Sequence, residues 1–131
     1  MNSDYKQSTY KVENRCYAIE GGVLMRSKSE VIIGNKLESF KIPYRYEEVI
    51  TLSGKPIAPA FIIKNPFTGE TFIWEHFGAL HLENYENSMN EKMNLFHRVG
   101  FVSQGQVIYS FEADIRNINF VVATIKNKIL K

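Results

Sequence analysis

The stretch IAPAFIIKNPFTGETFIWEHFG, residues 57–78, constrains the fold of this chain more than any other segment. Two apolar runs rich in Phe and Ile flank the turn residues Asn-Pro-Phe-Thr-Gly, a pattern typical of a β-hairpin. Pairing Asn65 with Glu70 across that turn fixes the register and places Ala60 directly opposite Glu75. Opposed residues of an antiparallel pair have Cβ atoms about 5 Å apart on one face of the sheet. We therefore expect Ala60 and Glu75 to be neighbours.

The rest of the chain predicts alternating helices and strands. A helix is expected from Ser27, where SKSEVIIGNKLESF repeats apolar residues at helical spacing, and a second over 83–100, ending on Gly100. IPYRYEEVITL (42–52) precedes the hairpin and predicts a third antiparallel strand. QVIYSFE (106–112) predicts a last strand, and NINFVVATIKNKIL (117–130) a C-terminal helix. This order predicts an α/β fold with a central mixed sheet flanked by helices, because the last strand returns after a helical crossover.

Composition limits the class of protein. A chain of 131 residues, 44% hydrophobic and 23% charged, is typical of a single globular domain. Gly21-Gly22 marks a seam, so we expect an N-terminal extension over 1–23 and a domain over 24–131. No apolar run approaches the roughly 18 residues of a membrane helix. The single Cys16 and the polar residues 1–15 favour a cytoplasmic setting, and the net charge of +2 leaves the partner open.

The predicted register gathers acids around the hairpin. Two opposed carboxylates would suit a divalent ion, but only Glu75 is an acid in the pair described above. If the turn SGKP pairs Leu52 with Ile57, Glu47 lies beside Ile62 on the same face and becomes a possible auxiliary acid. An acid at the end of a strand is also a common solvated residue. The spacing alone thus leaves the role of Glu75 open.

Glu30 has two interpretations. Ser27 and Glu30 match the S-x-x-E capping box, in which the glutamate caps its own helix. Glu30 also lies on the apolar stripe of the helix, which favours an acid that faces inward. Both remain open at the level of the residues.

Several short motifs occur in a specific order: RSKSE at 26–30, YRYE at 44–47, APAF at 58–61, WEHFG at 74–78 and VIYSFE at 107–112. In this order they resemble a bacterial and phage branch of the PD-(D/E)xK nuclease superfamily, whose pattern is RSKSE, YRYE, PDF, WEH and a late FE. The resemblance covers residues 24–130. It implies a restriction-endonuclease-like α-β-β-β-α-β core with an additional C-terminal helix.

The resemblance also implies a metal site. Glu30 would be the helix acid and Glu75 the second metal-binding carboxylate, and Ala60 occupies the place of the metal-binding aspartate of the family. The implied cofactor is Mg²⁺ or Mn²⁺. An alanine at that place predicts loss of activity and of most metal affinity, either through deliberate inactivation of a toxic nuclease or through natural loss of the site.

The lysine of the superfamily motif is also missing, because Phe77 stands where it is expected. His76 is the polar neighbour, and it could act through its ring or bind metal through its backbone carbonyl. In a regular strand its side chain points away from Glu75. Lys28 and Lys92 are alternative sources of the positive charge.

The resemblance therefore predicts a divalent-metal-dependent nuclease that hydrolyses phosphodiester bonds of nucleic acid, with DNA as the expected substrate. Processing of mobile elements and conflict with phage are the settings that the branch implies. A nuclease-like module that binds nucleic acid or protein without catalysis is the alternative, for which Ala60 would be natural. Homo-oligomerisation remains open.

Overall fold

A computed structural model describes residues 5–7, 15, 17–18, 24–78, 83–98, 100 and 105–130. Four strands form one mixed sheet in the order β3-β6-β7-β8: the first three are antiparallel, and β8 runs parallel to β7. The predicted α/β fold with a mixed sheet is confirmed. The sheet strands are β3 (Tyr44–Tyr46), β6 (Phe61–Lys64), β7 (Thr71–Phe77) and β8 (Val107–Phe111). The helices are α1 (Lys28–Ser39), α2 (Glu83–Arg98), α3 (Glu112–Ile115) and α4 (Ile118–Thr124), which continues as a π-helical segment, Ile125–Ile129.

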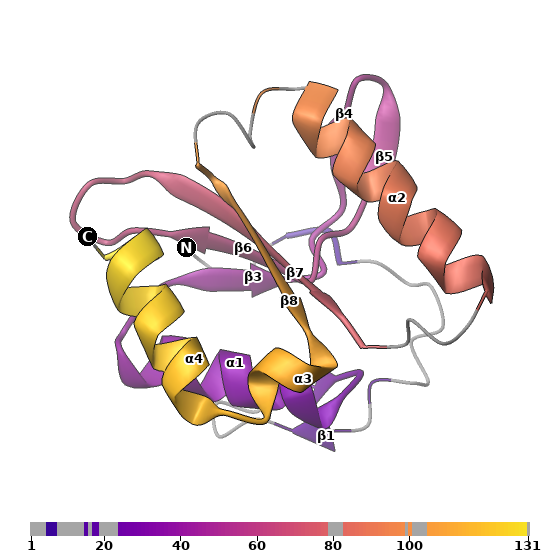
Figure 1. Cartoon of the computed structure of the whole chain (residues 1–131). Helices are drawn as coiled ribbons and strands as arrows, with labels where there is room; N and C mark the ends of the chain where they lie inside the picture. The colour runs from indigo at the N-terminus through magenta and orange to yellow at the C-terminus, as the bar shows by residue number, and fades with distance from the viewer. Residues whose placement is uncertain are drawn as a thin grey trace.

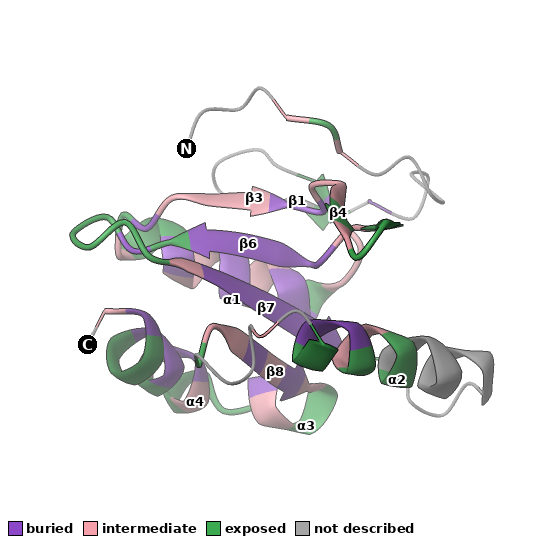
Figure 2. Cartoon of the chain, turned by 90° about the horizontal axis from the view of Figure 1, so that it is seen from above, coloured by how far each residue is buried: buried purple, intermediate pink, exposed green. Residues whose placement is uncertain are grey.

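Helices cover both faces of the sheet. Figure 1 shows α1, α3 and α4 along one face of the sheet and α2 on the other side, and Lys92 of α2 contacts Glu75 of β7. The hydrophobic core lies between the sheet and α1, α3 and α4, and the buried colouring of β6 and β7 in Figure 2 marks its centre. Trp74 and Phe61 are fully buried there. The described part of the chain contains no helix that is both long enough and apolar enough to cross a membrane.

The β6–β7 hairpin has the predicted register. The N–H of Asn65 donates to the carbonyl of Glu70 at 2.8 Å, and Phe61 pairs with Trp74. The Asn65 side chain accepts from the N–H groups of Phe67 and Thr68 and donates to the carbonyl of Ile129 at 2.7 Å. Asn65 thus fixes the turn and ties it to the C-terminal helix, which explains how a buried polar residue holds the register.

The predicted register of the preceding hairpin is wrong by two residues. Strands β4 (Ile50–Leu52) and β5 (Lys55–Ile57) form their own two-stranded sheet, in which Leu52 pairs with Lys55. The turn is only two residues long, because Ser53 and Gly54 both adopt positive φ (51° and 79°), the geometry of a type I′ turn. The predicted strand over 42–52 also ends early: β3 stops at Tyr46 because Glu47 has φ 54°.

Because β3 ends at Tyr46, Glu47 lies at a different place from the one predicted. Its backbone N–H donates to the carbonyl of Ala60 at 3.0 Å, so Glu47 lies beside Ala60 and not beside Ile62 as predicted. The acid therefore stands in one row across the sheet with Ala60, Glu75 and Tyr109, the last of which pairs with Glu75 across β7 and β8.

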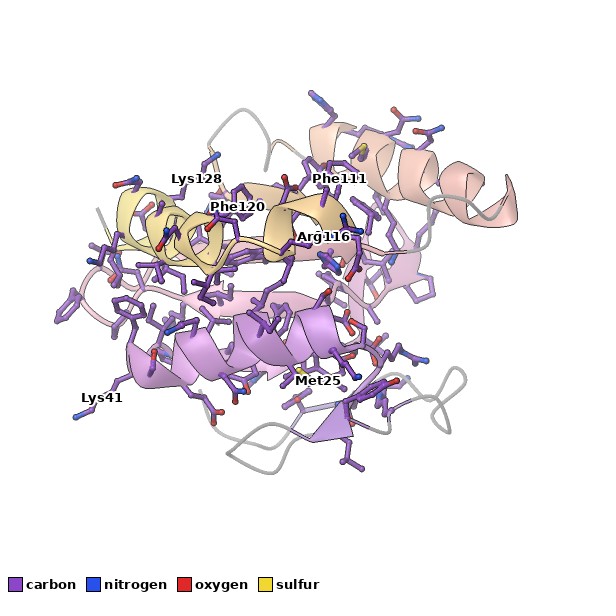
Figure 3. All side chains as sticks on the ribbon, turned by 60° about the horizontal axis from the view of Figure 1, so that its bottom comes forward. Met25, Lys41, Phe111, Arg116, Phe120 and Lys128 are labelled. Carbon is purple, nitrogen blue, oxygen red and sulfur yellow. The ribbon has the colours of Figure 1, made fainter. Side chains whose placement is uncertain are left out.

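The described residues of 1–23 contact the region after the predicted seam. Strand β1 (Tyr17–Ala18) pairs with β2 (Leu24–Met25), and β2 lies against α1 with Met25, labelled in Figure 3, fully buried. The Tyr5 hydroxyl donates to the carbonyl of Tyr46 at 3.2 Å and accepts from its N–H. The edge of β3 is covered by this contact. Cys16 lies outside the described residues.

The single helix predicted over 117–130 differs from the structure at its start. A short helix, α3, precedes it, and α4 begins at Ile118 after Asn117, whose side chain accepts from the N–H of Asn119. Ile118 is 43% exposed, whereas Val121 is fully buried. The buried stripe therefore starts at Val121 and continues through the π-helical segment to Ile125 and Ile129.

Candidate functional site

Ala60 and Glu75 are in direct contact at one end of the sheet. The backbone N–H of Ala60 donates a short hydrogen bond to Oε1 of Glu75, and Oε2 of Glu75 lies 3.0 Å from Nζ of Lys92 on α2. Glu75 is 2% exposed. A buried carboxylate needs such partners, because an unpaired charge away from water is strongly destabilising. Residue 60, which directly precedes β6, and Lys92 of α2 thus hold this acid.

Glu30 reaches the same region from the first turn of α1. Its backbone N–H donates to the Ser27 hydroxyl, as the capping pattern predicts, but its own carboxylate accepts from the hydroxyl of Tyr46 at 2.8 Å. Burial raises the pKa of Glu30 to about 7; the Tyr46 hydrogen bond opposes this rise, and the charges of Glu47 and Glu75 add to it. Glu30 therefore exchanges a proton near neutral pH while lying within electrostatic reach of two other acids.

Two arginines neutralise Glu47. Its Oε1 lies 2.7 Å from Nη2 of Arg15, and its Oε2 accepts from Nε of Arg26 at 2.6 Å. Arg15 is 8% exposed although it precedes β1. Glu47 has positive φ, a strained conformation for a residue other than glycine. Its ion pairs with the two arginines help to hold it in that conformation. Residues from the N-terminal region therefore contribute to the site.

His76 lies on the opposite side of β7 from Glu75. The His76 Nδ1 is 2.8 Å from Oγ of Ser110, and the His76 Nε2 is 3.2 Å from Oε2 of Glu112. The Ser110 oxygen accepts a hydrogen bond from Nε1 of Trp74 at 2.9 Å. The His76 ring is only 2% exposed. Burial lowers the pKa of His76 below its ordinary value, against the opposing effect of Glu112. His76 is therefore neutral at neutral pH, and its ring does not face the Ala60–Glu75 pair.

Glu112 connects this histidine to α1. Its second oxygen, Oε1, accepts a short hydrogen bond from the hydroxyl of Ser29, the residue next to Glu30. A Cβ at Gly78 would lie 3.0 Å from Oε2 of Glu112, so the glycine of WEHFG leaves room for the carboxylate. Burial tends to raise the pKa of Glu112, but the hydrogen bonds from Ser29 and His76 outweigh it and lower the pKa.

Tyr109 adds an unsatisfied polar group to the row of Glu75. Its hydroxyl is buried and has no hydrogen-bond partner among the residues that the structure describes. Its ring stacks on Phe77 with centroids 5.9 Å apart. Burial raises the pKa of Tyr109, and the charge of Glu75 adds to the rise. A buried hydroxyl without a partner is able to donate to a ligand or a water.

Of the residues expected from the sequence, the structure joins Ala60, Glu75 and Lys92 by direct contacts and brings Glu30 within electrostatic range of Glu75. His76 lies on the other side of β7. Within the described ranges, no group of three or more His, Cys, Asp or Glu side chains is arranged to hold a metal ion.

Sequence reasoning missed the partners that hold these residues. They include Arg15, Tyr46, Tyr109, Ser110 and Glu112. Tyr46 belongs to YRYE, and Tyr109, Ser110 and Glu112 belong to VIYSFE, so the motifs contained these residues but gave no indication of the contacts that they make. No local spacing indicates that Arg15 bonds Glu47.

Comparison of the chain with protein-family models, with curated proteins and with solved structures finds no match. A functional assignment therefore rests on the residues of the site and on the order of the motifs.

Proposed function

We propose that this chain has the framework of a divalent-metal-dependent nuclease acting on DNA, and that Ala60 leaves it without catalysis. The observation that carries the proposal is the contact between residue 60 and the buried Glu75, with Lys92 on the same carboxylate. The motif order from RSKSE to the late FE supports the same family. A cytoplasmic setting and processing of mobile or phage DNA belong to this proposal.

The residues present do not fit a metal ion while position 60 is alanine. The described acids form no metal-binding group, and Glu75 is already engaged by the Lys92 ammonium and the Ala60 N–H. An aspartate at 60 would add a carboxylate beside Glu75, the hard oxygen ligands that Mg²⁺ and Mn²⁺ prefer. When bound, the ion would supply Lewis-acid polarisation of a phosphoryl oxygen and neutralise charge on the leaving oxygen.

Glu30 is the candidate proton acceptor. A general base works best when its pKa is near the working pH, and that of Glu30 is about 7. In the proposed reaction a water molecule gives its proton to Glu30, the water oxygen bonds to phosphorus, the bond from phosphorus to the 3′ oxygen breaks, and the departing 3′ oxygen takes a proton from solvent. The product then carries a 5′-phosphate.

Lys92 and Tyr109 are the candidate phosphate contacts. The Lys92 side chain is 37% exposed and already lies 3.0 Å from Glu75, so its ammonium stands where positive charge would meet a phosphodiester. Tyr109 lies in the same row as Glu75, and its hydroxyl, which has no partner among the residues that the structure describes, can donate to a phosphate oxygen. Lys92 thereby takes the part of the lysine that Phe77 replaces in the motif.

The test is Ala60→Asp. With Mn²⁺ or Mg²⁺ the variant is expected to cut plasmid or single-stranded DNA, whereas the parent chain and the charge-free variant Ala60→Asn are not. A second readout needs no substrate: Mn²⁺ should raise the melting temperature of Ala60→Asp by mass action and leave Ala60→Asn unchanged. A folded Ala60→Asp protein that neither binds Mn²⁺ nor cuts DNA or RNA would show the proposal to be wrong.

One observation favours a non-catalytic module as the second candidate function. Glu75 is paired with Lys92, and Glu47 with two arginines, so this region is stable without a metal. Lys41 and Lys128 extend from the surface (Figure 3) and could contact phosphates. This alternative predicts that the parent chain binds DNA in EDTA with an affinity that falls as salt rises. Ala60→Asp would then bind equally well and remain inactive.

A further inference from the structure

We infer that Glu112 is a positioning residue, which joins the helix that carries Glu30 to the strand that carries Glu75. The inference rests on the proposed function for its catalytic consequence, but the cross-link itself is a property of the present chain. Glu112 is the acid of the late FE motif, and it takes no direct part in the reaction proposed above.

The directions of the hydrogen bonds around Glu112 follow from which atoms carry protons. The Trp74 indole can only donate, so Ser110 accepts from it and uses its single hydroxyl proton to donate to Nδ1 of His76. His76 therefore keeps its proton on Nε2 and donates to Oε2 of Glu112. The Glu112 carboxylate at the end of this series only accepts hydrogen bonds. Each bond of the series therefore has one donor and one acceptor.

The remaining oxygen of Glu112 completes the cross-link. Ser29 is 5% exposed and donates its hydroxyl proton to Oε1, so one carboxylate holds β7 through His76 and α1 through Ser29. Ser29 precedes Glu30 in the first turn of α1, and His76 follows Glu75 in β7. Both proposed catalytic acids are thus one residue away from a group bound to Glu112.

The location and exposure of His76 and Glu112 fit a role in positioning the site and not in catalysis. The His76 ring is 2% exposed, and both of its nitrogens have partners, so it does not reach a substrate phosphate. Glu112 is about half exposed but lies on the far side of β7 from Glu75. Gly78 leaves space for its carboxylate, because a Cβ there would come within 3.0 Å of Oε2. The cluster therefore shapes the site without touching the reacting atoms.

The first experiment uses the parent chain and no metal. The Val31 N–H closes the first turn of α1 on the Ser27 carbonyl at 3.2 Å, and the Phe40 N–H closes the last turn on Lys36. Glu112→Gln and Ser29→Ala should each speed amide hydrogen exchange of Val31 about tenfold, because a charge-assisted hydrogen bond is lost. Exchange of Phe40 should stay unchanged. Glu38→Gln, an exposed substitution at the other end of α1, is the matched control.

The second experiment uses Ala60→Asp as the background. There Ser29→Ala, which changes no charge, should weaken Mn²⁺ binding measured by titration calorimetry by about tenfold, the usual effect of losing a group that orients a ligand. Glu112→Gln should weaken Mn²⁺ binding to the same extent. The double variant should bind Mn²⁺ no more weakly than the single variant with the lower affinity, because both substitutions remove the same link.

The outcomes of these experiments distinguish the Glu112 cross-link from the proposed function. Unchanged Val31 exchange in both variants of the parent chain would overturn the cross-link, whatever the activity of Ala60→Asp. If Ala60→Asp binds Mn²⁺ and cuts DNA but Ser29→Ala alters neither property, Glu112 has no positioning role. An Ala60→Asp protein that fails to bind and cut, with faster Val31 exchange in the parent variants, refutes the proposed function and supports the cross-link.

Discussion

Replacing Glu30 with glutamine is expected to stabilise the protein at neutral and alkaline pH and to leave it unchanged near pH 4.5. Burial raises the pKa of Glu30 from 4.5 to about 7, with the Tyr46 hydrogen bond opposing and the charges of Glu47 and Glu75 adding. The folded state therefore binds the proton more tightly than the unfolded state. The free energy of unfolding falls as pH rises through this interval, and the loss is complete above pH 7.

The magnitude follows from the two pKa values. At about 1.4 kcal/mol for each pKa unit, a rise from 4.5 to about 7 corresponds to about 3.5 kcal/mol. Glutamine has nearly the same shape, and its carbonyl oxygen still accepts from the Tyr46 hydroxyl, so the substitution removes the ionisation and keeps the hydrogen bond. The gain in stability is thus a measure of what the buried charge costs.

The assay is urea denaturation of the parent chain and of Glu30→Gln at several pH values from 4.5 to 8.5, in EDTA. The difference in free energy of unfolding should grow from near zero at pH 4.5 to about 3.5 kcal/mol at pH 8.5. Taking the difference cancels the titration of His76, which acts in both proteins. Glu38→Gln, an exposed substitution on the same helix, is the matched control. A difference that is constant across this range would refute the reasoning.

Two further predictions concern the partners of the site and the turn. Lys92→Met should destabilise the protein by about 1–2 kcal/mol, because it leaves the buried Glu75 without its ammonium partner. This value is reduced for solvent screening, since Lys92 is partly exposed. Thermal denaturation of the variant checks the prediction, and an unchanged melting temperature would contradict it. Asn65→Ala should cost about 2–3 kcal/mol in urea denaturation, since three hydrogen bonds are lost, whereas Phe67→Ala in the same turn, 86% exposed, should stay within about 0.5 kcal/mol.

The β6–β7 hairpin could be predicted because its register depends on local chemistry. Asn65 and Gly69 sit at the turn positions that suit them, with Gly69 at φ 78°, and the flanking apolar runs leave one register. The β4–β5 hairpin could not be predicted in the same way. Its turn places Ser53 at φ 51°, a conformation that a serine rarely adopts, so SGKP indicates a longer turn than the structure has.

The facing of Ala60 and Glu75 was predictable, but the partners that hold the candidate site residues were not. Glu75 could be paired with Ala60 because a hairpin relates nearby residues by simple counting. The ion pair of Glu47 with Arg15 and the bond of Glu112 with Ser29 join residues far apart in the chain. Such contacts depend on how helices pack on the sheet, which local spacing does not encode.

Glu75 and Glu30 differ in a way that bears on function. Glu75 is held by an ammonium and a backbone N–H, whereas Glu30 has a hydroxyl partner and a pKa near 7 that reflects an unfavourable buried charge. Glutamine would keep the Tyr46 contact without that charge, so folding alone does not account for a carboxylate at 30. Perturbed acids of this kind concentrate at functional sites. An aspartate at 60 would add a third charge, and a divalent cation is the partner that would offset it.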